Sequence, residues 1–440
     1  MPNQFTTSLW GDEAFSAVLS KDSILRIIDV SARDTYPPLY NITEHILFQL
    51  FGNSEIAIRS LSFLYFLLTV FFVYKIGTFL WNKRVGITAA ALTFLNPFFF
   101  IYAFEGRMYS ILALGVTASM YFFLKLSKKE HGAWIGYVLS TAWALYSHHF
   151  SMFALFVQGI WFLYEYVFGK RKVAISMFKA FIAIGILYLP WTIPLYNQAT
   201  RVGGGFWLGT PTLKDFGGVI SEFLANGIKH PFAIPALYLT YLALLIRNWI
   251  KGFRKSLFLV MWFLLPILLT WVISQKFQSI FFNRYLLYAI PGAMLILASN
   301  WRKPVSNVLI AMVLIFFAII DFNYFTHPTK KPFKEFANFV KEARQEGDFL
   351  LNWNAASHHI WESKYYGIPA PIYVPEGELP FYVGTAQMRD EDILREIPKN
   401  IERVGVITSG DIAEIDLPNY TEKEAQIFGD LKFIWYQRKF

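Results

Sequence analysis

The sequence predicts an all-α polytopic membrane domain followed by a small α/β domain. Of the 440 residues, 55% are hydrophobic and only 16% are charged, and there are 45 Phe, 24 Tyr and 14 Trp. A soluble globule of this size could not bury so many large apolar side chains, whereas a bilayer covers them. The long apolar runs stop near residue 322, after which charged and apolar residues mix. We therefore assign 1–325 to the membrane domain and 326–440 to a soluble domain.

Ten apolar stretches approach the roughly 20 residues that a helix needs to cross a bilayer. They are 57–81, 86–104, 108–126, 132–147, 150–168, 173–196, 231–249, 256–274, 285–300 and 304–321. Several are shorter than a full span, so the expected number of transmembrane helices is about ten.

Basic residues mark every second connection between these stretches. The clusters are Lys83-Arg84, Lys128-Lys129, Lys170-Arg171-Lys172, the group Arg247, Lys251, Arg254 and Lys255, and Arg302-Lys303. Because Lys and Arg are retained in the cytoplasm, this alternation predicts a multi-pass cell-membrane protein. The remaining connections are then extracytoplasmic: 1–56, 105–107, 147–149, 197–230, 275–284 and everything after 321.

Two classes of function are disfavoured by composition. The net charge is +9, but the basic residues fall in short clusters between apolar runs rather than in one patch, so we expect no nucleic-acid partner. The chain has no cysteine, which excludes disulfides and thiolate metal sites within this sequence.

The last part of the chain reads as a soluble α/β domain. An amphipathic helix is predicted over 333–346, where three phenylalanines alternate with charged residues. Four short apolar runs read as strands, at 348–353, 370–374, 403–408 and 431–436.

Adjacent carboxylates, Asp12 and Glu13, lie in the acid-rich external segment 1–56. An acceptor hydroxyl does not lose its proton unaided at neutral pH, so a carboxylate at the outer membrane face is suited to act as general base. The same pair is typical of a helix start, with Asp12 capping a helix that begins at Glu13. The two interpretations are compatible, because a capping residue can also be catalytic.

A second ionisable pair, Glu105 and Arg107, lies in the external turn between two spans. Charged groups this close to hydrocarbon are costly and tend to be functional. Glu105 is suited to hold a metal or orient an acceptor, and Arg107 to meet a phosphate. The alternative is an ion pair between them in the headgroup region.

The other candidates also lie at external helix ends. His148 is a metal-ligand candidate or an interfacial histidine. Gln198 and Trp207 lie in a long loop suited to cover a substrate, or to form an interfacial aromatic belt. Arg284 and Tyr285 enter a helix at the depth where a donor phosphate, or an ordinary headgroup phosphate, would lie.

The order and spacing of these motifs resemble the GT-C membrane glycosyltransferases, in the bacterial branch (glycosyltransferase family 39) similar to protein O-mannosyltransferases and aminoarabinose transferases. The resemblance runs through nearly the whole chain. It is carried by Asp12-Glu13, Pro37-Pro38-Leu39-Tyr40, the segment from Tyr102 to Tyr109, His148, Leu189-Pro190-Trp191 with Gln198, and Arg284-Tyr285.

The resemblance implies that a sugar moves from a polyprenyl phosphate to a hydroxyl with inversion at the anomeric carbon. It implies Asp12 as the base, Glu13 and Glu105 as positioning groups, and Arg107 and Arg284, with Tyr285, at the departing phosphate. Tyr40, His148, Gln198 and Trp207 would face the substrate, and Glu13, Glu105 and His148 would hold Mg²⁺ or Mn²⁺ if a metal takes part. The expected partners are the lipid-linked donor, the bilayer, and a protein, lipid or glycan acceptor.

Two departures from the family pattern accompany the match. Tyr36 stands where the family usually has a histidine, and only eleven residues precede the acidic pair, where the family has a membrane helix. We therefore expect a first helix upstream of this sequence. The competing classes are a transporter or flippase of lipid-linked glycans and a non-catalytic relative that binds lipid or glycan.

Overall fold

The chain divides into two units in a computed structural model that describes residues 3–169, 171–227, 233–299, 304–354 and 358–439. The helix unit comprises Thr35–Tyr40 and Arg59–Phe325, and the sheet unit comprises Met1–Asp34, Asn41–Ile58 and Thr326–Phe440. Each is described separately below.

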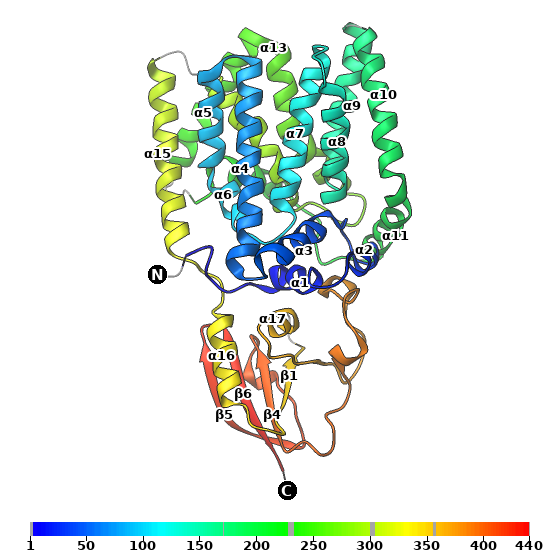
Figure 1. Cartoon of the computed structure of the whole chain (residues 1–440). Coiled ribbons are helices and arrows are strands. Elements are labelled where there is room, and N and C mark those ends of the chain that lie inside the picture. Colours follow the sequence, from blue (N-terminus) through cyan, green and yellow to red (C-terminus); the bar gives the residue numbers. More distant parts are fainter. Residues whose placement is uncertain (1–2, 170, 228–232, 300–303, 355–357, 440) are drawn as a thin grey trace. The chain divides into compact units, whose positions relative to one another are not determined.

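The helix unit is a bundle of apolar helices (Figure 1). Within the described ranges, six helices are long and apolar enough to cross a membrane: Glu55–Leu80 (α4), Tyr109–Ser127 (α7), Ser151–Phe168 (α9), Arg171–Gly203 (α10, η1 and α11 together), Arg254–Ile273 (within α13, Ala233–Ile273) and Ser306–Thr326 (within α15, Pro304–Thr326). A bent pair, α5 (Lys83–Phe94) and α6 (Pro97–Ala103), makes a seventh if it is counted as one span.

Several of the ten predicted apolar stretches are broken or shorter than a full span in the described residues. The run 86–104 is broken at Asn96 and Pro97, where α5 and α6 meet at a bend of 68°. Asn96 caps α6 by accepting a hydrogen bond from Phe99 N at 3.0 Å, and Pro97 takes the first helical position. The run 285–300 likewise becomes a 3-10 helix, η2 (Asn283–Ala289), followed by the short α14 (Ile290–Ala298). Part of 231–249 lies outside the described residues.

The run 132–147 is the 15-residue α8 (Ala133–Ser147), which packs closely on α7. A Cβ atom at Gly115 of α7 would lie 2.8 Å from Ala144 Cα of α8, so only glycine permits this approach. Buried polar groups between the helices satisfy one another: Ser119 and Thr141 hydroxyls are 2.7 Å apart, and Gln158 accepts from Tyr137 Oη at 2.8 Å. The bundle is thus held by small residues and internal hydrogen bonds, as in membrane proteins.

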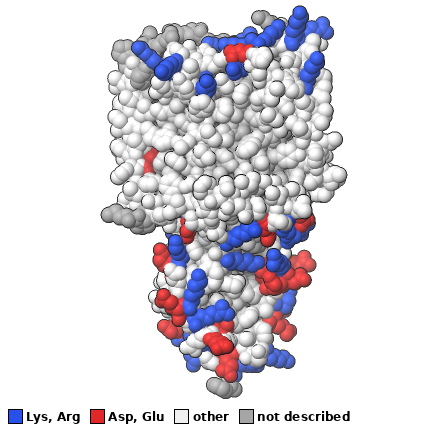
Figure 2. Space-filling model, in the orientation of Figure 1, with Lys and Arg blue, Asp and Glu red and all other residues white. Residues whose placement is uncertain are grey.

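On the face that Figure 2 shows, the middle of the helix unit is almost free of charged side chains, and Lys and Arg side chains gather at one end of it. The basic clusters belong to the connections α4–α5, α7–α8 and α9–α10. The turns α6–α7 and α8–α9 are the alternate connections, so they lie at the opposite ends of the same helices. Glu105, Arg107 and His148 therefore share one end of the bundle.

The sheet unit contains the N-terminal helices α1 (Gly11–Leu19), α2 (Ile24–Arg33) and most of α3 (Leu39–Phe51). It also contains α16 (Phe333–Ala343), α17 (Ile360–Tyr365) and a six-stranded sheet of order β3-β2-β1-β4-β6-β5. β1 to β4 pair in parallel, and β6 is antiparallel to both β4 and β5. The strands are β1 (Phe349–Trp353), β2 (Ile372–Tyr373), β3 (Ile393–Leu394), β4 (Arg403–Thr408), β5 (Tyr420–Phe428) and β6 (Leu431–Arg438).

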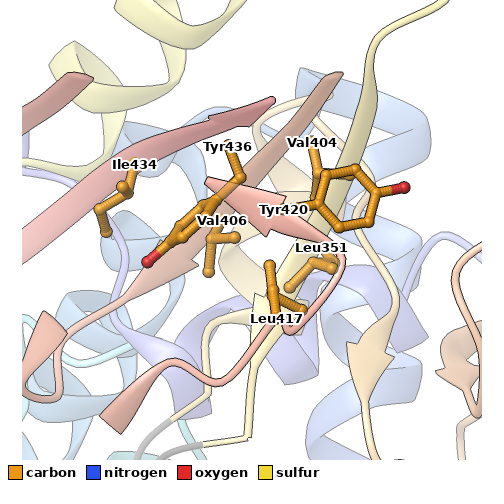
Figure 3. Close-up of a cluster of buried hydrophobic side chains, with 7 residues drawn as sticks. All are labelled: Leu351, Val404, Val406, Leu417, Tyr420, Ile434 and Tyr436. Carbon is orange, nitrogen blue, oxygen red and sulfur yellow. The ribbon is translucent and has the colours of Figure 1, made fainter. Parts of the chain in front are cut away.

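The four predicted strands and the amphipathic helix are present as β1, β2, β4, β6 and α16, whereas β3 and β5 were not predicted. Residues 421–427 of β5 are all exposed. The sequence of β5 therefore lacks the alternation of apolar and polar residues that indicates a half-buried strand. Figure 3 shows one core cluster of the sheet, in which Leu351 of β1, Val404 and Val406 of β4 and Ile434 of β6 are buried. The N-terminal helices lie in the same unit as this sheet, although they precede it by about 300 residues of membrane sequence.

Candidate active site

The acidic pair lies in the first turn of α1, in the sheet unit. The helix begins at Gly11 and its N-cap is Trp10, so the prediction that Asp12 caps a helix starting at Glu13 is wrong. Instead, Glu13 reaches back and accepts a hydrogen bond from Trp10 N at 3.4 Å. Both carboxylates are favoured here by the positive end of the helix dipole. Asp12 is half-buried and does not serve as the cap.

Glu13 is fully buried and forms an ion pair with Lys330, whose Nζ lies 2.8 Å from Glu13 Oε2. Lys330 comes from the segment between α15 and α16. An uncompensated buried carboxylate would cost several kcal/mol, so this lysine is part of what allows Glu13 to be buried. Sequence analysis missed Lys330, because nothing in the pattern indicated that a residue 317 positions away would lie beside α1.

Glu105 and Arg107 form the turn between α6 and α7 in the helix unit, and both are buried. The turn is tight, because Arg107 N donates to Glu105 O at 2.7 Å. The Arg107 guanidinium lies 5.3 Å from the centre of the Tyr36 ring, a cation–π contact. Tyr36, which replaces the expected histidine, thus supports Arg107.

Arg284 is surrounded by aromatic rings. Its guanidinium carbon lies 4.8 Å from the Phe282 ring centre and 5.4 Å from that of Tyr109. Asn283 fixes the backbone, since its Oδ1 accepts from Arg284 N at 2.7 Å, while its Nδ2 donates to Glu222 of α12 (Leu213–Ala225) at 2.7 Å. Asn283 and Glu222 are further residues that sequence analysis did not identify.

Tyr285 and His148 are in direct contact, with ring centres 5.0 Å apart. Phe150 N donates to His148 Nδ1 at 3.1 Å, which leaves Nε2 as the nitrogen able to donate. Burial lowers the pKa of His148 well below its ordinary value, and the positive charges of Arg107 and Arg284 lower the pKa further. His148 is therefore neutral at pH 7, and both arginines act electrostatically on it.

Two more predicted residues join this cluster at its edge. Gln198 Oε1 of α11 (Thr192–Gly203) accepts a hydrogen bond from His149 Nε2 at 2.6 Å, and Gln198 thus contacts His149 rather than His148. Trp207 is 47% exposed and its ring centre lies 5.2 Å from that of Phe282. Tyr40 is completely buried in the helix unit.

Across the described ranges, no three His, Cys, Asp or Glu side chains come together in a way that could hold a metal ion. Of the predicted metal ligands, Glu13 is paired with Lys330, and one His148 nitrogen accepts a backbone hydrogen bond. The chemistry that these residues support directly is anion binding by two arginines and proton transfer by a carboxylate.

Sequence and structure comparisons agree on one class of protein. Residues 35–197 match the family described as dolichyl-phosphate-mannose-protein mannosyltransferase. The undecaprenyl phosphate-alpha-4-amino-4-deoxy-L-arabinose arabinosyl transferase of Yersinia enterocolitica is 27% identical over 254 residues, which are 52% of this chain. That match spans less than half, 44%, of the relative's own length.

Solved structures of two proteins have a fold similar to most of this chain. ArnT from Cupriavidus metallidurans aligns over 98% of this chain and 95% of its own, with 13% identity, at a TM-score of 0.70 in the apo state and 0.69 bound to undecaprenyl phosphate. The oligosaccharyltransferase AglB from Archaeoglobus fulgidus aligns over 91% of this chain and 66% of its own, with 13% identity and a TM-score of 0.54.

These similarities define a GT-C membrane glycosyltransferase fold with a small C-terminal sheet domain, as predicted. The resemblance to the protein mannosyltransferases and aminoarabinose transferases, drawn from the motifs, is confirmed as well. The chain has this fold, and its long apolar helices make it a multi-pass membrane protein.

Proposed function

We propose that this protein transfers a sugar from a polyprenyl-phosphate donor to an acceptor hydroxyl, with Asp12 as the general base. The observation that carries the proposal is the cluster of Arg107, Arg284, His148 and Tyr285 in a GT-C fold. Arg107 lies two residues before Tyr109, whose ring is 5.4 Å from the Arg284 guanidinium carbon, so two basic residues meet at the start of α7 and form a positive site suited to a phosphate. Similarity to enzymes named for undecaprenyl-phosphate and dolichyl-phosphate donors supports the lipid-linked donor.

The proposed reaction is a single displacement. The acceptor oxygen attacks the anomeric carbon as its proton passes to the Asp12 carboxylate, and the bond between that carbon and the phosphate oxygen breaks. The electron pair of the broken bond stays on the phosphate, which leaves as polyprenyl phosphate with its charge stabilised by Arg107 and Arg284. Attack opposite to the leaving group inverts the anomeric configuration.

The reaction is proposed to take place at the extracytoplasmic face. The basic connections of the helix unit lie at the end opposite to Glu105, Arg107 and His148, and the positive-inside rule puts the basic end in the cytoplasm. The proposed acceptor is a protein, lipid or glycan hydroxyl, and the sugar is a hexose or pentose.

An Asp12→Asn protein tests the proposal with a labelled polyprenyl-phosphate sugar as donor. Loss of a general base typically costs 10²- to 10⁴-fold, so we expect transfer to fall by at least about 100-fold. Asp29→Asn is the matched control, because Asp29 is exposed on α2 and pairs there with Arg26 and Arg33. Undiminished transfer by Asp12→Asn would remove Asp12 from the mechanism.

A second candidate function, movement of lipid-linked glycans across the bilayer, is favoured by one observation. Asp321 is a buried carboxylate within the candidate span α15, and neither oxygen has a hydrogen-bond partner among the described residues. Such residues mark transport pathways in many membrane proteins. Asp321→Asn separates the two functions, because it would abolish movement of the glycan and leave sugar transfer in detergent unchanged.

A further inference from the structure

Buried and partly buried contacts connect the segment around the acidic pair to the chain that follows the last membrane helix. Lys330 pairs with Glu13 at 2.8 Å, and four residues further on Lys334 N donates to Ser8 Oγ at 3.0 Å. Tyr366 Oη accepts from Leu9 N at 2.8 Å. All of these contacts lie within the sheet unit, and they hold residues 8–13 from the C-terminal part of the chain.

Among these contacts, the one made by Lys330 bears on the acidic turn itself. The Glu13 side chain is 0% exposed and that of Lys330 is 16% exposed, so the pair is largely shielded from water. A shielded charge pair with good geometry resists separation much more than a surface pair, and removing one partner leaves a buried charge. Glu13 also accepts from Trp10 N at the helix start, so its position fixes the first turn that carries Asp12.

We propose that Lys330 is a positioning residue for the acidic pair: it holds Glu13 in place and thereby fixes the first turn of α1, on which Asp12 is carried. This inference rests on the proposed function for its catalytic consequence, but its structural part does not depend on it. It gives the segment after α15 a role in the reaction, in addition to linking the membrane helices to the sheet.

The test compares Lys330→Met, Lys330→Arg and Glu13→Gln in the full-length protein. We expect Lys330→Met to lower kcat by about 10- to 100-fold with less than a threefold change in KM for the donor, and Lys330→Arg to recover most of the activity. Because Lys330 acts through Glu13, adding Lys330→Met to Glu13→Gln should change kcat by less than about twofold. If Lys330→Met lowers kcat by the same factor in the wild type and in the Glu13→Gln protein, the proposal is overturned.

The matched control is Arg403→Met, which breaks a similar pair in the sheet unit, with Arg403 Nη1 3.1 Å from Asp348 Oδ2 and the Asp348 side chain 5% exposed. This variant should lose stability and keep wild-type kcat. If Arg403→Met lowers kcat as much as Lys330→Met does, general destabilisation explains the result and the proposal fails.

Hydrogen exchange separates this proposal from the proposed function. In Lys330→Met the amides of residues 12–16 should exchange at least tenfold faster than in the wild type, while those of β4 remain unchanged. Unchanged exchange in α1 would overturn the positioning role, whether or not the wild type transfers sugar. Faster exchange in α1 with no transfer by the wild type would leave the positioning role standing and reject the proposed function alone.

Discussion

Neighbouring residues hold both the side chain and the backbone of Arg284 in position. The ring centres of Phe282 and Tyr109 lie 4.8 and 5.4 Å from the guanidinium carbon. Asn283 accepts a hydrogen bond from Arg284 N and donates one to Glu222. Because arginine stacks on rings and still presents its N–H groups, such a setting leaves the charge available to a phosphate. Few of these contacts could be predicted from the sequence: Arg284-Tyr285 stood out as a motif, whereas Glu222 is distant in sequence.

The histidine next to His148 gives a pH-dependent prediction. Burial lowers the pKa of His149 to about 4 from an ordinary value of 6.5, despite its hydrogen bond to Gln198. Between these values the unfolded chain binds the proton and the folded protein does not, so stability decreases as the pH falls from 6.5 toward 4. The loss at this one site is up to ~3 kcal/mol.

The measurement is the melting temperature in detergent from pH 7.5 to pH 4.5. His149→Gln should lose distinctly less stability over this range than the wild type. His131→Gln, a change in the connection between α7 and α8, serves as the control and should follow the wild type. Parallel acid-induced losses in the wild type and His149→Gln would show that His149 does not titrate in this way.

At the scale of single elements, the sequence predicted apolar runs better than helix boundaries. Hydrophobicity alone does not distinguish one straight span from two helices meeting at a bend, although Asn96-Pro97 was a readable helix-start signal inside the run 86–104. The start of α1 was misplaced by two residues, because adjacent acidic residues fit either the cap or the first turn. β5 is stabilised by pairing with β6 rather than by its own apolar pattern.

The close packing of α7 on α8 gives a prediction at this scale. In Gly115→Val the new Cβ atom would lie 2.8 Å from Ala144 Cα, closer than van der Waals contact allows. The two helices would therefore have to move apart. We expect a loss of about 1–3 kcal/mol, typical of overpacking, seen as a lower melting temperature. Gly159→Ala on α9 is the control, because a Cβ atom there meets nothing within 4 Å. If Gly115→Val and Gly159→Ala lowered the melting temperature equally, the close contact between α7 and α8 would be contradicted.

For the whole molecule, the sequence predicted the membrane class and the soluble C-terminal part, but it did not reveal that α1 and α2 belong to the same unit as the sheet. That grouping depends on contacts such as Glu13–Lys330, between residues hundreds of positions apart. Composition and the alternation of basic connections are visible directly in the sequence. Contacts between residues that are distant in sequence form only when the chain folds.

We predict that the sheet unit lies on the extracytoplasmic side of the membrane and the basic connections lie in the cytoplasm. The chain has no cysteine, so single cysteines can be introduced without background labelling. Gln426→Cys on the exposed face of β5 should react with a membrane-impermeant maleimide in intact cells. Lys129→Cys, in a basic connection, should react only after the membrane is opened. The reverse pattern would place the sheet unit in the cytoplasm.

In the proposed reaction, the bond between the sugar and the lipid phosphate breaks and the sugar passes to a hydroxyl with inversion. The most direct measurement follows a doubly labelled polyprenyl-phosphate sugar with the purified protein and determines both products and the anomeric configuration. We predict one polyprenyl phosphate released for each sugar transferred, with the configuration inverted. The proposed reaction would be contradicted if the donor moved to the other leaflet without losing its sugar. It would also be contradicted if the sugar were transferred with its anomeric configuration retained.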